Sequence, residues 1–121
     1  MNSLKRAQSA YGAAANCVKT PKAIETDIIV RITTALSKCD KAQKQDYAAF
    51  VEALDRNRKL WSIIADDVAQ SENGLPQDLR SRLFYLAEFT RTYTSKILAE
   101  KVSVTPLLEV NTAVIKGLRN G

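Results

Sequence analysis

The sequence predicts an all-α fold: a single-domain helical bundle of four to five helices with a basic N-terminal arm. Four glycines and three prolines among 121 residues leave few breaks between long segments. Within those segments, apolar residues recur three and four positions apart, which is the period of one face of an α-helix. The length suits one domain with a substantial core. We therefore divide the chain into a partly mobile arm, residues 1–19, and a helical bundle, residues 20–121.

The arm is basic and contains little apolar bulk. Residues 1–22 carry four basic side chains and no acidic one. Such charge serves solubility, or it contacts RNA or an acidic partner. Gln8, Ser9 and Gly12 interrupt the continuous apolar run that a secretory signal requires. We therefore expect a cytoplasmic protein whose cysteines are reduced thiols.

The first long helix is expected from about Pro21 to Lys38. Thr20 can cap it, and Pro21 suits its first position because the amide proton that proline lacks has no helical acceptor there. The apolar face of this helix consists of Ile24, Ile28, Ile32, Ala35, Leu36 and Cys39. Ile29 widens the face, which predicts contact with more than one neighbouring element.

The second helix is expected from about Lys41 or Gln43 to Gln70, with Asp40 as its N-cap. Its apolar stripe keeps the helical spacing for about six turns. The stripe consists of Tyr47, Phe50, Val51, Leu54, Trp61, Ile64, Ala65 and Val68. Asn57 and Arg58 lie on its two borders, so their polar groups require partners.

The third helix is expected from about Pro76 to Glu100, and the last from Thr105 to about Leu118. The core stripe of the third helix consists of Leu79, Leu83, Leu86, Tyr93 and Ile97, with Phe89 widening one edge. Phe84 projects away from this stripe, and Tyr85 lies just outside it on the other side. An off-stripe phenylalanine either packs under a loop or terminal arm, or forms part of an exposed binding surface.

Asn111 falls near the middle of the inward face of the last helix, which is otherwise formed by Leu107, Val110, Val114, Ile115 and Leu118. A buried asparagine lowers stability unless its amide is paired. We therefore predict that Asn111 forms a hydrogen bond with Asn57 or Arg58 and so fixes the register of the helices. The alternative is that both asparagines recognise a partner.

The residue inventory predicts no enzyme, no cofactor and no metal site. The chain has no histidine, which is the commonest general base and metal ligand. Cys17 and Cys39 do not form a zinc-binding pattern, and no glycine-rich phosphate loop is present. The apolar runs fall short of the ~18 residues that span a bilayer, so no membrane insertion is expected.

Three segments carry distinctive motifs. Residues 53–61 read Ala-Leu-Asp-Arg-Asn-Arg-Lys-Leu-Trp, residues 75–76 read Leu-Pro, and residues 108–118 read Leu-Glu-Val-Asn-Thr-Ala-Val-Ile-Lys-Gly-Leu. In this order they resemble the alphaproteobacterial FlaF family of flagellar biosynthesis regulators, over about residues 11–118. The resemblance assigns Asn57, Arg58, Trp61 and Asn111 to family motifs, and we expect these four residues to be structural.

The resemblance implies a cytoplasmic factor required for flagellin synthesis and secretion. In the family this factor is understood as a flagellin-binding chaperone that also acts with the translational regulator FlbT. The terminal segments of flagellin are amphipathic helices, and a helical groove can cover their apolar faces until export. Phe84, Tyr85 and Ile29 are the predicted partner-binding residues, because they add apolar surface beyond the core stripes.

Two other functions stay open from the sequence. One is an RNA-binding post-transcriptional regulator that contacts flagellin mRNA through the basic arm, with an affinity that falls steeply as salt rises. The other is an adaptor that binds FlbT alone.

Overall fold

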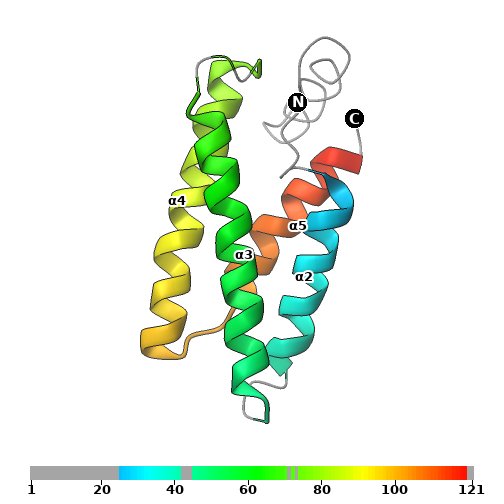
Figure 1. Cartoon of the computed structure of the whole chain (residues 1–121), viewed down its shortest axis with the longest axis vertical. Coiled ribbons are helices and arrows are strands. Elements are labelled where there is room, and N and C mark those ends of the chain that lie inside the picture. The colour runs from blue at the N-terminus through cyan, green and yellow to red at the C-terminus, as the bar shows by residue number, and fades with distance from the viewer. Residues whose placement is uncertain (1–24, 42–44, 71, 73, 120–121) are drawn as a thin grey trace.

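The computed structural model describes residues 25–41, 45–70, 72 and 74–119, and confirms the all-α class. Its helices are α2 (Thr26–Lys41), α3 (Tyr47–Val68), α4 (Gln77–Glu100) and α5 (Thr105–Arg119). In Figure 1, α3 stands between α4 and α2; a loop leaves the lower end of α4, and α5 then rises from behind α3 to the upper end of α2. The predicted arm, Thr20 and Pro21 lie outside the described residues.

The boundaries of α2 differ from the prediction at both ends. The helix begins at Thr26, and Glu25 precedes it, accepting a backbone hydrogen bond of 3.3 Å from the amide of Ile29. Asp27 lies in the first turn, where a carboxylate interacts favourably with the helix dipole. At the other end α2 continues to Lys41. Asp40 is therefore part of α2 and does not cap the following helix.

The N-cap of α3 is Asp46. Its backbone is extended, with φ −142° and ψ 76°, and its carboxylate accepts a hydrogen bond of 3.0 Å from the amide of Ala49. This bond satisfies one of the backbone amides that the first turn of a helix leaves without a partner. The prediction of Asp40 as the cap was wrong because the sequence offers two aspartates between the helices, and α2 incorporates the first of them.

Replacing Asp46 by alanine is expected to lower the free energy of unfolding by about 1 kcal/mol, the usual loss of an N-cap side chain. Urea denaturation followed by circular dichroism measures the loss. Asp46→Asn is the control, because its amide oxygen can still accept from Ala49. An Asp46→Ala protein as stable as the control would show that this cap does not stabilise α3.

Two apolar clusters form the core. The first contains Ile29, Ile32, Leu60, Trp61, Ile64, Val68, Leu75, Leu79, Leu83, Ala87, Val114 and Ile115. The second contains Leu36, Phe50, Ala53, Leu54, Ile97, Val104 and Leu107. Along each helix, polar side chains separate the members of the two clusters. We call these side chains the polar layer: Thr33, Asn57, Thr90, Thr94 and Asn111.

The buried face of α4 is displaced from the predicted stripe. It consists of Leu79, Leu83, Ala87, Thr90, Thr94 and Ile97. Leu86 and Tyr93, which the spacing placed in the core, are partly buried. The reason is that α4 packs most extensively against α3 and much less against α5. Ala87, Thr90 and Thr94 are therefore buried, while Leu86 and Phe89 border a hollow beside α5.

Helices α4 and α5 are joined closely at one end and separate at the other. After α4, Lys101 adopts a left-handed conformation with φ 56°, and Val104 is fully buried. The Tyr93 hydroxyl donates a hydrogen bond of 2.7 Å to the carbonyl oxygen of Ser103 in this connection. From there the two helices diverge, α4 toward one side of α3 and α5 toward α2 (Figure 1). Among the described residues, α4 and α5 therefore have little contact along this edge.

Candidate functional site

The Asn111 side chain is the centre of a buried hydrogen-bond network. Its Oδ1 accepts from the indole Nε1 of Trp61 at 2.9 Å, and its Nδ2 donates to the Oδ1 of Asn57 at 2.8 Å. The same Nδ2 donates to the Thr33 hydroxyl at 3.0 Å. Asn57 and Asn111 are fully buried. The network therefore joins α5 to α3 and to α2, and it contains the predicted hydrogen bond between the two asparagines.

The donors and acceptors of this network have one consistent arrangement. The Thr33 hydroxyl donates to the carbonyl oxygen of Ile29 at 2.6 Å, so its oxygen is left to accept from Asn111. Both amide protons of Asn111 are then used. A flipped amide would direct its NH₂ group at the Trp61 N–H, placing two donors against each other. The orientation of the Asn111 amide is thus determined by its neighbours.

The network spans a wide gap between α3 and α5. No Cα atom of α3 comes within 8 Å of one in α5 in the described part of the chain. The Trp61 indole and the two carboxamides bridge this distance. Two further polar atoms of the layer, Asn57 Nδ2 and Thr90 Oγ1, are buried without a hydrogen-bond partner among the described residues. Burying such groups lowers stability, so the layer specifies the arrangement of the helices more than it adds to their stability.

Arg58 is not part of this network. Its side chain is 46% exposed, and Nη2 donates to Asp55 Oδ1 at 2.8 Å, while Lys59 Nζ lies 2.9 Å from the other oxygen of Asp55. Hydrogen bonds from Lys59 and then Arg58 lower the pKa of the Asp55 carboxyl. The proposal of Arg58 as an alternative partner of Asn111 was wrong because Arg58 lies on the solvent side of α3, where it pairs within its own helix.

Asn111→Ala is expected to lower the free energy of unfolding by about 3 kcal/mol, because Trp61 Nε1 and Asn57 Oδ1 lose their partners while they stay buried. Chemical denaturation measures the change. Thr112→Ala alters the exposed neighbouring position of the same helix and should change stability by less than about 0.5 kcal/mol. Equal stabilities of the two variants would refute a structural role for the Asn111 amide.

Phe84 and Tyr85 are exposed on α4, at 43% and 67% of their surface. Phe84 borders a hollow of about 370 Å³ where α3 ends, which is also lined by Val68, Ala69, Gln77, Arg80 and Ser81. The Nε of Arg80 donates to the Val68 carbonyl oxygen at 2.8 Å and so holds the two helices together beside this hollow. Phe84 is therefore exposed in the structure, and its role in partner binding stays a prediction.

Ile29 is not on the surface. It is 1% exposed and belongs to the first apolar cluster. The apolar face of α2 is broad because α2 packs against both α3 and α5, so its extra width is used inside the bundle. The structure therefore corrects the prediction of Ile29 as a partner-binding residue. Its neighbour Ile28 is 36% exposed.

A second hollow lies along the open edge of the bundle, and we call it the α4–α5 groove. It encloses about 340 Å³ and is lined by Arg82, Leu86, Phe89, Pro106, Glu109, Val110 and Ala113. No prediction from the sequence identified it. The available signal was the 106, 110, 113 spacing on the last helix, which places three apolar residues on a face beside the one that carries Asn111.

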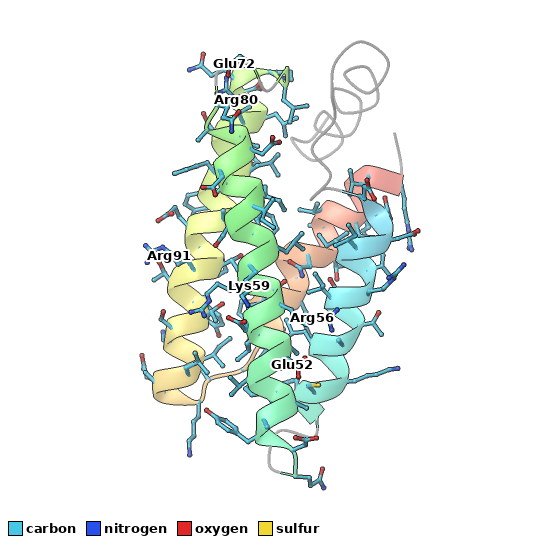
Figure 2. All side chains as sticks on the ribbon, viewed as in Figure 1. Glu52, Arg56, Lys59, Glu72, Arg80 and Arg91 are labelled. Atoms are coloured by element: carbon cyan, nitrogen blue, oxygen red, sulfur yellow. The ribbon has the colours of Figure 1, made fainter. Side chains whose placement is uncertain are left out.

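The described residues can be compared with the needs of a metal site and of a membrane span. They contain no group of three or more histidine, cysteine, aspartate or glutamate side chains that could hold a metal ion. Cys39 is a free, half-buried thiol that packs against the second apolar cluster. None of the helices in the described part is long and apolar enough to cross a membrane. Figure 2 shows charged side chains such as Glu52, Lys59 and Arg91 distributed along α3 and α4.

The described residues thus form a small all-α bundle with a buried polar network, exposed Phe84 and Tyr85 on α4, and an apolar hollow between α4 and α5. The chain belongs to the family of the flagellar protein FlaF, whose family model matches residues 7–118. This match includes the segments around Asn57, Trp61 and Asn111 and confirms the resemblance. No curated protein and no solved structure gives a significant match to the chain.

Proposed function

We propose that this protein is a cytoplasmic flagellin-binding chaperone and a positive factor for flagellin synthesis and secretion. Membership of the FlaF family supports a flagellar role. The observation that carries the binding role is the pair of exposed aromatic residues on α4, Phe84 and Tyr85. Aromatic side chains are enriched in protein interfaces, where they bury a large apolar area.

Phe84 and Tyr85 are not needed to fill the core of the bundle. Phe84 and Tyr85 belong to neither apolar cluster. Tyr85 precedes Phe89 by one helical turn, so its ring extends the apolar surface of α4 outward from the α4–α5 groove. An amphipathic segment of flagellin that covers this surface would be kept from assembling prematurely. The effect on flagellin expression, with FlbT as a second partner, would follow from such binding.

The double variant Phe84→Asp, Tyr85→Asp is expected to bind flagellin at least about tenfold more weakly, which corresponds to about 1.4 kcal/mol. Two carboxylates would replace apolar contacts and would have to be desolvated on binding. Isothermal titration of the purified protein with flagellin monomer measures the affinity, and circular dichroism confirms that the variant is folded.

Ile63→Asp is the matched control, because Ile63 is an apolar residue of α3 that is 57% exposed. It should bind flagellin as the unchanged protein does. Undiminished binding by the folded double variant would exclude the aromatic pair as a binding surface. Titration of flagellin leader RNA at two salt concentrations tests the other function: binding that disappears as salt rises would favour the RNA regulator. Binding of FlbT alone would favour the adaptor.

A further inference from the structure

We infer that the α4–α5 groove is the seat for one amphipathic helix of the partner, and that this helix carries an acidic side chain on the border facing α4 and a basic side chain on the border facing α5. The inference rests on the proposed function for the identity of the partner, which is flagellin. It adds the place of docking and the charge pattern that the bound helix must have.

The groove exists because one helix–helix contact of the bundle, that between α4 and α5, is slight. In a closed four-helix bundle, each helix packs against two neighbours around the core. Here α2 packs against α3 and α5, and α3 packs against α2 and α4, whereas the contact between α4 and α5 is slight. Tyr93 closes the lower end of this edge through its hydrogen bond to Ser103, and it stacks on Phe89 with 5.5 Å between ring centroids. Beyond Phe89, the described residues leave a hollow along this edge.

The floor of the groove is apolar and continuous with the core. Leu86 of α4 and Val110 of α5 are partly buried and pack against the first apolar cluster. Pro106 and Ala113 lie one turn away from Val110 on either side along α5. These residues form rows along the two helices, and side chains spaced three or four apart on a third helix fit between such rows. A volume of about 340 Å³ accepts a few side chains, so the groove fits one turn or two of an apolar stripe.

The two walls of the groove carry opposite charges. Arg82 stands on α4 and Glu109 on α5, and both are exposed. Neither Arg82 nor Glu109 takes part in the ion pairs of the described residues. Such pairs join Asp55 to Arg58 and Lys59, and Glu88 to Arg91. An apolar floor with charged walls is the usual composition of a protein interface, and the charges select the partner and its orientation. A carboxylate near Arg82 and a cation near Glu109 would complete both pairs.

The charges of the groove also distinguish among three candidate ligands: the N-terminal segment of this chain, RNA and a helix of another protein. Residues 1–22 of the chain have four basic side chains, no acidic one and few large apolar residues, so they can supply a partner for Glu109 but none for Arg82. They also lack the apolar stripe that would fill the floor. RNA fits no better, because Glu109 would repel phosphate. A helix of another protein with both charges and an apolar face matches every part of the groove.

The test uses the full chain and purified flagellin monomer. Ala113→Trp fills the groove and is expected to weaken flagellin binding at least about tenfold. Arg82→Glu leaves the apolar floor intact, and it should slow association by about tenfold at low salt, a change at the low end of what interface mutations produce. High salt should remove most of that second effect by screening. Arg56→Glu makes the same change of charge on the exposed surface of α3 and is the control.

A second readout locates the contact directly. In ¹⁵N-labelled protein, unlabelled flagellin should shift the amide resonances of residues 82–89 and 106–113 more than those of the rest of the bundle. If Ala113→Trp fails to fold, the charge variant and the resonance shifts still decide the question. Wild-type binding and association by folded Ala113→Trp and Arg82→Glu would overturn the groove as the docking site.

The other outcomes are distinguishable. Loss of binding in the Phe84, Tyr85 variant together with normal binding in the groove variants would keep the chaperone function and reject the groove. If the unchanged protein does not bind flagellin, the proposed function and the groove assignment fail together. If Ala113→Trp instead converts a dimer into a monomer in sedimentation velocity, the groove is an interface between two copies of this chain and the inference is rejected.

Discussion

The arrangement of this bundle depends on the Asn111 amide. All of its hydrogen-bonding groups are used: it accepts from Trp61 and donates to Asn57 and Thr33. Apolar side chains would allow α5 to slide or rotate against its neighbours at little cost, because apolar contacts have no strong direction. A shift of one helical turn, about 5.4 Å, would break all three hydrogen bonds and leave buried polar atoms on three helices. The polar layer therefore selects one register and one rotation of α5.

The open edge of the bundle is a consequence of that selection. The network holds α5 against α2 and at a distance from α3 that the Trp61 indole and two carboxamides fill. In this position α5 diverges from α4 beyond the Tyr93–Ser103 hydrogen bond. A bundle in which α5 approached α4 along its whole length would bury Leu86 and Val110 and would have no groove. The buried polar network and the α4–α5 groove thus both depend on the position of α5.

Features that depend on local periodicity, such as the extents of the helices, could be predicted from the sequence. Features that depend on which helices pack together were predicted less well. The extents of α4 and α5 followed from the 3.6-residue period, and a hydrogen bond of Asn111 to Asn57 or Arg58 followed from the cost of burying an unpaired amide; the structure has the bond to Asn57. The role of Ile29 did not follow, because a wide apolar face is equally consistent with two internal neighbours or with one neighbour and a binding surface. The use of Thr90 and Thr94 in the core of α4 was missed for a related reason. Threonine has little apolar area, and it is buried there because α4 presents this side to α3.

The family motif at residues 108–118 contributes to two sides of α5, one in the core and one along the α4–α5 groove. Asn111 points inward to α3 and α2, whereas Glu109, Val110 and Ala113 line the α4–α5 groove. Positions on one short helix rotate together, so the hydrogen bonds of Asn111 also determine where Glu109 and Val110 point. A motif that looks purely structural at Asn111 therefore controls the geometry of a surface less than one turn away. For this reason, a change that rotates α5 would alter the shape of the proposed docking groove without replacing any residue that lines it.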